Sequence, residues 1–212
     1  MTVRVLLVDD HAVVREGYRR LLERTADIQV IAEASSGEEA YRLFCEQAPD
    51  VVVMDINLPT MSGIEVTHRL LAREPQAKVL VFSMHDEALL ASRVLQAGAF
   101  GYVTKASAPE VLVEAVRAVA QGRPYISHDM AQVLALQTVA GHDVALSTLS
   151  PREFEVFRLL AEGNPINEIA RILSLSQKTI ANYQSTIKQK LEADTSAQMV
   201  WIALKQGLVG ND

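Results

Sequence analysis

Two adjacent carboxylates, Asp9 and Asp10, follow a short apolar run near the start of the chain. Neighbouring carboxylates repel each other, and each tends to stay protonated unless a cation compensates the charge. A third carboxylate, Asp55, follows another apolar run in the same way. Oxygen donors of this kind, without a cluster of His or Cys ligands, favour Mg²⁺ over zinc. The three carboxylates therefore predict a magnesium site.

Two further polar residues indicate the chemistry of this site. Ser83 and Lys105 each come at the end of a later apolar run. A carboxylate such as Asp55 can accept a phosphoryl group as an aspartyl phosphate. The lysine ammonium can neutralise charge on the phosphoryl oxygens, and the serine hydroxyl can donate a hydrogen bond to one of them. The residue types thus predict phosphoryl transfer to Asp55. His11 is interpreted as a residue at the edge of the acidic pocket.

The apolar runs predict five buried strands of a parallel sheet. Continuous apolar runs that alternate with helical patterns are typical of parallel strands covered on both faces. The expected strands are 3–8, 29–34, 51–54, 78–82 and 100–103, and the expected helices are 12–24, 37–47, 63–73, 87–97 and 109–121. Five strand–helix repeats predict a doubly wound α/β domain with a five-stranded sheet. A strand order of 2-1-3-4-5 would bring the three carboxylates together at the carboxyl ends of the strands.

Three of these helices begin with a capping-box pattern, in which a serine is followed three residues later by a glutamate. Each serine is expected to be the N-cap of its helix, so the pattern also predicts where each helix begins. The three pairs are Ser36 with Glu39, Ser62 with Glu65, and Ser107 with Glu110.

The α/β pattern, and with it the first domain, is expected to span residues 1–122. Residues 123–147 are interpreted as a linker that carries one helix at 127–140. A small all-helical domain is expected over 148–212, because no strand pattern appears there and Ser150 begins a complete helix start with a proline in the first turn. Its expected helices are 151–162, 166–173, 177–191 and 195–206.

The helix expected over 177–191 has an apolar stripe on one side and a face without acids on the other. Residues 174–190 contain three lysines and no acid. Such a face can enter a DNA major groove without repelling phosphates, and Asn182 can read a base edge, preferably adenine. The helix is therefore predicted to bind double-stranded DNA. The apolar stripe consists of Ile180, Tyr183, Ile187 and Leu191, and the opposite face of Lys178, Ala181, Asn182, Ser185, Lys188 and Gln189.

The last expected helix is apolar at six successive positions, 199–204. One face can pack on its own domain, and the other then needs a partner. We expect Trp201, together with Val200 and Leu204, to anchor a homodimer interface.

Composition limits the classes of function. The net charge is −6, and residues 1–122 hold 12 Lys and Arg against 17 Asp and Glu, which argues against nucleic-acid binding by that half. No apolar stretch approaches the roughly 18 residues that span a membrane, and the first residues lack a signal-peptide layout. With Cys45 as the only cysteine, a reducing cytoplasm is expected.

The motifs VDDH, MDINLPTMSG, VFSMHD and GYVTK resemble the receiver domain of bacterial two-component response regulators over residues 3–121. The resemblance implies that Asp55 is the phosphoacceptor and that a sensor histidine kinase is the phosphodonor. It also implies that Asp10 binds Mg²⁺ directly, Asp9 through water, and Asn57 through its backbone carbonyl.

The same resemblance assigns roles to residues on the later strands. Ser83 fits the switch hydroxyl of the family, Lys105 its lysine, and Tyr102 the aromatic side chain that swings inward when the hydroxyl moves. Asn57 and His85 occupy positions that tune phosphate lifetime. Many receivers have proline after the lysine, whereas Ala106 stands here.

The segment from residue 149 to 191 resembles the LuxR-type helix-turn-helix, with a match that extends over roughly residues 146–210, and the whole chain thereby resembles the NarL/FixJ family of transcriptional regulators. This resemblance implies base-facing positions and positions near phosphates on the second helix of the motif. The base-facing positions are Ala181, Asn182 and Ser185, and the phosphate positions are Lys178, Thr179 and Lys188.

The leading hypothesis is a phosphorylation-switched, dimeric transcription regulator that binds DNA, acts with RNA polymerase, and catalyses only its own phosphoryl transfer and dephosphorylation. One alternative is a receiver that acts through protein contacts, with a degenerate DNA-binding domain. A second is a phosphatase of the haloacid-dehalogenase type, which also uses an aspartyl phosphate. That family has an Asp-x-Asp motif with the nucleophile first, whereas this chain has Asp9-Asp10-His11.

Overall fold

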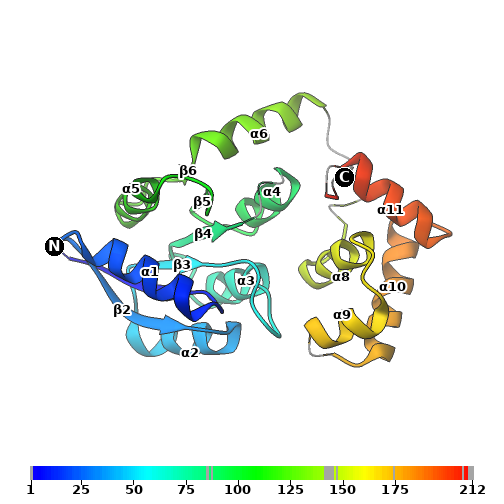
Figure 1. Ribbon diagram of the computed structural model, residues 1–212, viewed down its shortest axis with the longest axis horizontal. Coiled ribbons are helices and arrows are strands. Elements are labelled where there is room, and N and C mark those ends of the chain that lie inside the picture. Colours follow the sequence, from blue (N-terminus) through cyan, green and yellow to red (C-terminus); the bar gives the residue numbers. More distant parts are fainter. Residues whose placement is uncertain are drawn as a thin grey trace. The chain divides into compact units, whose positions relative to one another are not determined.

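The computed structural model of the protein describes residues 2–84, 86, 88–140, 146, 148–173, 175–206 and 208–209. The chain divides into two compact units, Met1–Leu136 and Gln137–Asp212. Figure 1 shows a sheet flanked by helices in the first unit and a group of helices in the second.

The first unit is built on a parallel sheet with the strand order β2-β1-β3-β4-β5-β6. The predicted α/β architecture and the predicted order of the first five strands are confirmed. The strands are β1 (Val3–Val8), β2 (Ile28–Ala34), β3 (Val51–Met54), β4 (Val79–Ser83), β5 (Gly101–Thr104) and β6 (Tyr125–Ile126).

The sheet has one strand more than the five that were predicted. β6 consists of only two residues, which pair with Gly101 and Tyr102 of β5. A two-residue strand carries no periodic signal in the sequence, so it lay unrecognised inside the segment interpreted as a linker.

Helices alternate with the strands of this unit, and their bounds match the predicted ones within about two residues. They are α1 (Ala12–Glu23), α2 (Gly37–Gln47), α3 (Gly63–Arg73), α4 (Ala88–Gln96), α5 (Pro109–Ala120) and α6 (His128–Ala140). The predicted serine caps of α2 and α3 are confirmed, because the Ser36 and Ser62 side chains accept hydrogen bonds from the third residue of each helix.

The predicted N-cap at Ser107 is wrong. Ala108 is the N-cap of α5, and Pro109 occupies the first helical position. Proline has no amide hydrogen and a φ suited to a helix, so it starts α5 one residue later than the serine pattern suggests. The Ser107 hydroxyl instead makes hydrogen bonds outside the helix.

Both faces of the sheet are buried. On one face, apolar residues of β1, β3, β4 and β5 pack with α1 and α5 in a single cluster that includes Leu7, Val53 and Val116. Because successive strand residues point to opposite faces, Leu6 and Val52 lie on the other face, and both are also fully buried. This core fixes the carboxyl ends of the strands, where the acidic residues follow.

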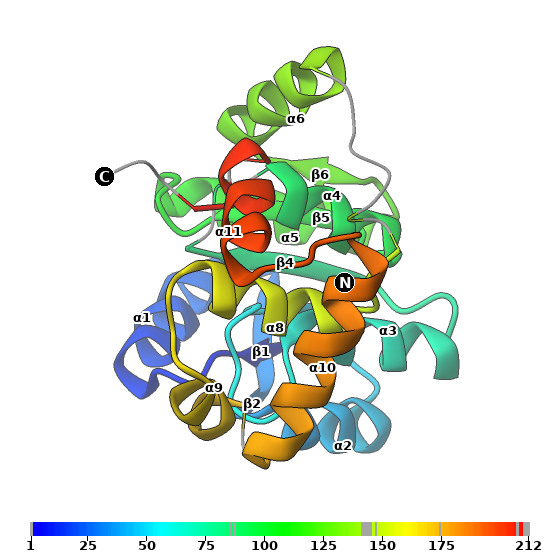
Figure 2. The ribbon, with the colours of Figure 1, turned by 90° about the vertical axis from the view of Figure 1, so that its right-hand side faces the viewer.

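The second unit contains the four predicted helices, which are α8 (Pro151–Ala161), α9 (Ile166–Ile172), α10 (Gln177–Lys190) and α11 (Ser196–Lys205). The predicted helix start at Ser150 is confirmed, because Ser150 and Glu153 form a reciprocal capping box. α10 packs on both α8 and α9, and α11 packs on α8 (Figure 2). Phe154, Phe157 and Ile169 are buried among these helices.

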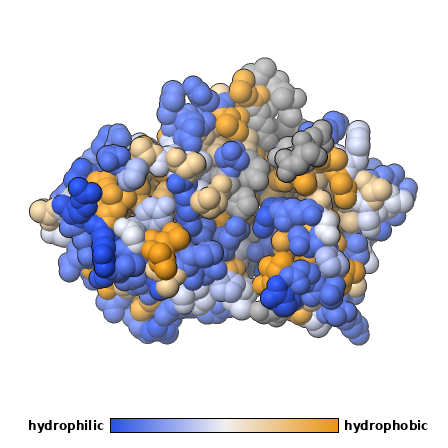
Figure 3. Space-filling model, in the orientation of Figure 1, coloured by the Kyte–Doolittle hydropathy of each residue, from blue (hydrophilic) through white to orange (hydrophobic). Residues whose placement is uncertain are grey.

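Large apolar side chains are exposed at only a few described positions, such as Val13 and Trp201. On the face seen in Figure 3, hydrophobic residues form small patches interrupted by hydrophilic ones. Within the described part of the chain, no helix has the length and apolar character needed to cross a membrane.

Candidate functional site

The predicted acidic residues lie at the carboxyl ends of two neighbouring strands. Asp9 follows β1 and Asp55 follows β3, and residues 5–8 of β1 pair in register with residues 51–54 of β3. The Asp55 amide donates to the Val8 carbonyl at 3.0 Å, so the ladder continues up to the acidic residue itself. Both carboxylates are buried, with exposed fractions of 2% for Asp9 and 4% for Asp55.

Lys105 bridges these two carboxylates. Its Nζ lies 2.6 Å from Oδ2 of Asp9 and 2.7 Å from Oδ2 of Asp55. The lysine side chain is only 6% exposed, so all three charges are largely removed from solvent. Buried charges are tolerated only when they are paired, and one ammonium here serves two carboxylates.

The electrostatics of the cluster are reflected in its ionisation. Burial raises the pKa of the Asp55 carboxyl above its ordinary value of 3.8, and the hydrogen bond from Lys105 offsets only part of that effect. Burial works against the charged lysine as well, yet its hydrogen bonds to Asp55 and Asp9 raise the pKa of Lys105. One ammonium thus faces two buried carboxylates, and a further cation beside Asp55 would favour its charged form.

Asp10 is placed differently from the other two carboxylates. Its side chain is about one-third exposed, and Oδ1 lies 2.7 Å from Nδ1 of His11. The His11 amide donates to Oδ1 of Asp9 at 2.8 Å, which holds the turn after β1. Among the described residues, Asp9, Asp10 and His11 form a group whose ligand atoms lie within 4.8 Å of one another. His11 thus lies at the edge of the acidic pocket, as expected, and its ring pairs with the most exposed carboxylate.

The loop after Asp55 is held close to the acidic residue. The Asn57 amide donates to Oδ1 of Asp55 at 3.3 Å, and the Gly63 amide donates to the Ile56 carbonyl at 2.9 Å. A Cβ at Gly63 would lie 2.0 Å from the Asp55 carbonyl oxygen. Glycine at the start of α3 is therefore what allows the loop to fold back onto Asp55.

Ser83 and Tyr102 both lie on the strands beside this cluster and are completely buried. Ser83 ends β4 and pairs with Thr104 of β5, while Tyr102 lies two residues earlier on β5. The Ser83 carbonyl accepts a hydrogen bond from the Lys105 amide at 2.7 Å. The serine and the lysine are thus joined through the backbone. His85 lies outside the described residues.

In the second unit, the apolar stripe predicted for α10 faces the core. Ile180, Ile187 and Leu191 are buried. Asn182 and Ser185 on the opposite face are exposed, as is Lys178, while Thr179, Ala181 and Lys188 are half-buried. Ser176 caps α10 by accepting a hydrogen bond from the Thr179 amide, so the helix begins where the sequence predicts.

On α11, Met199 and Ala203 are buried, whereas Trp201 is 62% exposed and Leu204 is 38% exposed. The Lys205 ammonium lies 5.5 Å from the centre of the Trp201 ring. Val200 is half-buried. Most of the Trp201 side chain therefore does not contribute to the core of its own unit.

Comparison with known proteins agrees with this arrangement. Residues 5–117 match the response regulator receiver domain, and residues 147–203 match the LuxR family of bacterial regulatory proteins. The chain is 43% identical over 208 residues to the transcriptional activator protein ExaE of Pseudomonas putida. The aligned residues cover 97% of this chain and 97% of ExaE. The chain is a response regulator of the NarL/FixJ family.

Two further relatives of this response regulator support the assignment. Response regulator UvrY of Escherichia coli K12 is 37% identical to it, over 97% of this chain and 95% of UvrY. A structure of RcsB from Salmonella enterica serovar Typhimurium, bound to the promoter rprA in the presence of phosphomimetic BeF3⁻, superposes with a TM-score of 0.69. That structure is 27% identical and covers 94% of this chain and 97% of RcsB.

Two side chains of α1, one that contacts Asp9 and one that packs on the neighbouring strand β4, were not predicted from the sequence. Arg15 of α1 donates to the Asp9 carbonyl at 2.6 Å, and its Nε donates to Glu33 at 3.0 Å. The Tyr18 ring packs edge-on against Phe82, with the ring centres 4.6 Å apart. Arg15 and Tyr18 are three residues apart on α1 and so share one face of it. This three-residue spacing on one helix face could have identified both residues from the sequence.

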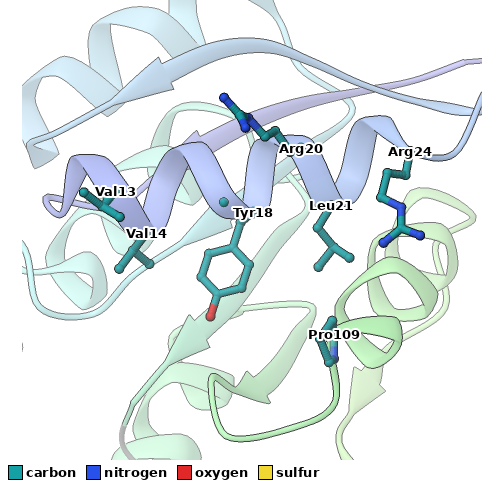
Figure 4. Close-up of a pocket in the computed structure, with 8 residues that line it drawn as sticks. Val13, Val14, Tyr18, Arg20, Leu21, Arg24 and Pro109 are labelled. Carbon is teal, nitrogen blue, oxygen red and sulfur yellow. The ribbon is translucent and has the colours of Figure 1, made fainter.

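The receiver domain also carries a groove along α1, and none of the residues that line this groove belongs to the acidic cluster. It has a volume of about 460 Å³ and lies beside the start of α5 at Pro109. Figure 4 shows Val14, Tyr18 and Leu21 on the same side of the helix, facing toward Pro109. The groove is predominantly apolar, and none of its lining residues is a carboxylate.

Proposed function

We propose that this response regulator accepts a phosphoryl group on Asp55 and that the modification controls its binding to DNA. The observation that carries the proposal is the Lys105 ammonium shared by Asp9 and Asp55 at the ends of β1 and β3. A carboxylate oxygen of Asp55 forms a bond to phosphorus as the bond between phosphorus and the donor group breaks. The donor we propose is the phosphohistidine of a sensor histidine kinase.

Each residue of the site has its own proposed role in that transfer. Asp55 is held by the Asn57 amide on one oxygen and by Lys105 on the other. As the phosphoryl group arrives, the Lys105 ammonium can move from the carboxylate to a phosphoryl oxygen and compensate its charge. Ser83, buried on the adjacent strand, is proposed to donate its hydroxyl to a second oxygen, and Tyr102 to occupy the space that this movement opens.

The donor set of the site fits Mg²⁺. Its side-chain ligands are carboxylate oxygens, and a single ammonium, that of Lys105, serves both Asp9 and Asp55. We propose that Asp9, Asp10, Asp55 and the backbone carbonyl of Asn57 hold the ion. When bound, the ion supplies positive charge next to the phosphoryl oxygens.

Phosphorylation of the full chain by acetyl phosphate with Mg²⁺, followed by peptide mass mapping, tests this part of the proposal. The label is expected on Asp55, and Asp55→Asn is expected to abolish it. Asp194→Asn, which removes an exposed acid of the second unit, serves as the matched control and is expected to retain the label. A label that persists in Asp55→Asn would contradict the proposal, and release of phosphate from small phosphomonoesters would favour a phosphatase instead.

We further propose that α10 binds double-stranded DNA. The support is its exposed face, where Asn182 and Ser185 lie beside Lys178 with no acid in residues 174–190. Ala181, Asn182 and Ser185 would face the bases, and Lys178, Thr179 and Lys188 the phosphates.

The DNA proposal is tested by binding to a selected duplex across a range of salt concentrations. Lys178→Ala is expected to reduce the slope of log affinity against log salt by about one and to weaken binding to all sequences alike. Asn182→Ala is expected to cost about 1–3 kcal/mol on the preferred sequence only. Arg123→Ala, outside the DNA-binding unit, is the control. Absence of binding even at low salt would favour a protein that acts through protein contacts alone.

The remaining partners follow from this proposal. Activation is proposed to produce a homodimer through Val200, Trp201 and Leu204, because two half-sites add their binding energies. RNA polymerase is the expected target of the DNA-bound dimer, and the bacterial cytoplasm is the expected location. The functional domains are proposed to be a receiver at 1–122, a linker at 123–147 and a DNA-binding domain at 148–212.

A further inference from the structure

A hydrogen-bond network connects the residues that flank Lys105 to the first turn of α6. Thr104, the last residue of β5, is 1% exposed. Its hydroxyl donates to Oδ2 of Asp129 at 2.7 Å and lies 2.9 Å from the hydroxyl of Ser107. The Ser107 hydroxyl is also 3.4 Å from each carboxylate oxygen of Asp129. The Asp129 carboxylate therefore accepts hydrogen bonds from Thr104, which precedes Lys105, and from Ser107, which follows it.

The start of α6 is anchored to the same strand through its backbone. β6 pairs with β5, and the Ser127 amide then donates to the Tyr102 carbonyl at 3.0 Å. Met130, in the first turn of α6, is completely buried. Figure 1 shows β6 beside β5 and leading directly into α6. The first turn of α6 is thus a fixed part of the sheet edge, next to the strand that ends in Lys105.

The charge and position of Asp129 suit this contact. A carboxylate in the first turn of a helix is stabilised by the free backbone amides there. Burial raises the pKa of Asp129, but the hydrogen bonds that it accepts, including that from Thr104, outweigh this effect and lower it. The carboxylate is therefore ionised at neutral pH and is a strong acceptor for the buried hydroxyl of Thr104.

We infer that Asp129 is a positioning residue for Lys105, acting through Thr104 and Ser107, and that it couples the acceptor site to the start of α6. The inference rests on the proposed phosphorylation of Asp55. Lys105 has Thr104 directly before it, and its amide is bound to the Ser83 carbonyl. Fixing the turn on both sides holds the ammonium at the position that Asp9 and Asp55 require. Because coupling is reciprocal, a shift of Lys105 toward a phosphoryl oxygen also changes the contact that holds α6.

The test measures phosphorylation of the full chain by acetyl phosphate, as a maximal rate and a half-saturating donor concentration. Asp129→Asn and Thr104→Val remove the contact from its two sides, and Glu110→Gln, an exposed acid in the first turn of α5, is the matched control. Asp129→Asn and Thr104→Val are each expected to lower the maximal rate roughly 3- to 30-fold, which lies within the range found for side chains of one network, at an unchanged half-saturating concentration. Glu110→Gln is expected to match the wild type.

The decisive comparison repeats Asp129→Asn and Thr104→Val in a Lys105→Ala background. If Asp129 acts through Lys105, Asp129→Asn in the Lys105→Ala background lowers the maximal rate by less than about a further twofold. Equal losses in both backgrounds, or an unchanged rate in Asp129→Asn, would overturn the inference while leaving phosphorylation of Asp55 intact. Asp129 is exposed, so Asp129→Asn keeps the test available if Thr104→Val does not fold. A wild-type chain that takes up no phosphoryl group would overturn the proposed function itself.

A second readout reports on α6 directly. Hydrogen exchange of the amides in the first turn of α6 is expected to change when the wild-type chain is phosphorylated and to remain constant in phosphorylated Thr104→Val. Identical exchange in the wild type before and after phosphorylation would contradict the coupling.

Discussion

At the scale of single residues, the site depends on one ammonium that serves two buried carboxylates. Asp9 and Asp55 share Lys105, and burial leaves Asp55 with a raised pKa. The proposed binding of Mg²⁺ and the proposed transfer of a phosphoryl group both rest on this arrangement of two carboxylates and one ammonium. That these residues lie together could be predicted from the sequence, because each follows an apolar run that was expected to form a strand. The pairing of Asp10 with His11 could not, since it depends on the turn after β1.

Removal of the lysine tests the balance of charge. Lys105→Ala is expected to destabilise the fold by about 3–5 kcal/mol, because it leaves two buried carboxylates without their partner. Mg²⁺ is expected to restore part of that loss, and urea unfolding with and without the ion measures both effects. Arg20→Ala, which breaks the exposed pair with Glu16, should cost at most about 1 kcal/mol and be insensitive to Mg²⁺. Equal sensitivity of the two variants to Mg²⁺ would argue against an ion at the acidic cluster.

The pH dependence of phosphorylation follows from the state of Asp55. Only the ionised carboxylate is a nucleophile, and its pKa in the folded protein is raised above 3.8. In the protein without Mg²⁺, the Asp55 carboxyl should therefore titrate with a midpoint above that value, which carboxyl NMR measures. The sign for stability is the reverse of the usual carboxylate case. The contribution of Asp55 to stability is largest below its unfolded-state pKa and declines as pH rises through the folded-state pKa. A midpoint at or below 3.8 in the protein without Mg²⁺ would contradict the burial argument.

At the scale of elements, the sequence predicted the five longer strands, their order, and ten helices of the described part of the chain, with small errors at the ends. Periodicity and capping residues suffice for such elements because they are long enough to repeat a pattern. β6 was missed because two residues carry no period. The start of α5 at residue 109 was correct, but its N-cap was wrongly assigned to Ser107, because Pro109 in the first helical position makes Ala108 the N-cap. The contact of Asp129 with Thr104 depends on β6, so local sequence patterns could not predict this contact either.

Two glycines on helices provide a matched test of how the site is packed. Gly63→Ala is expected to destabilise the fold by about 3 kcal/mol or more and to slow phosphorylation, because the new Cβ would lie 2.0 Å from the Asp55 carbonyl oxygen. Gly17→Ala, within α1, meets no atom within 4 Å and is expected to stabilise by about 0.5–1 kcal/mol. Chemical denaturation of both variants measures the difference. A Gly63→Ala chain with wild-type stability and rate would show that the loop after Asp55 can move away freely.

At the scale of the whole molecule, a receiver domain precedes a LuxR-type unit whose α10 carries an exposed face without acids. The proposed homodimer would supply the second half-site, and Trp201 is its proposed anchor, with 62% of its surface exposed. Trp201→Ala is expected to weaken the phosphorylated dimer by roughly 30-fold, the scale of an interface hot spot of about 2 kcal/mol. Analytical ultracentrifugation measures this, and Leu136→Ala, an exposed apolar residue of α6, is the control. An unchanged dimer would exclude this face of α11 as the interface.

The central claim is that the state of Asp55 controls binding to DNA. Selection of genomic DNA fragments by the wild-type chain and by Asp55→Asn, each with acetyl phosphate and Mg²⁺, tests it most directly. The account predicts that the wild type enriches a defined set of fragments with a two-fold-related sequence and that Asp55→Asn enriches them far less. Equal enrichment of the same fragments by both proteins would contradict it.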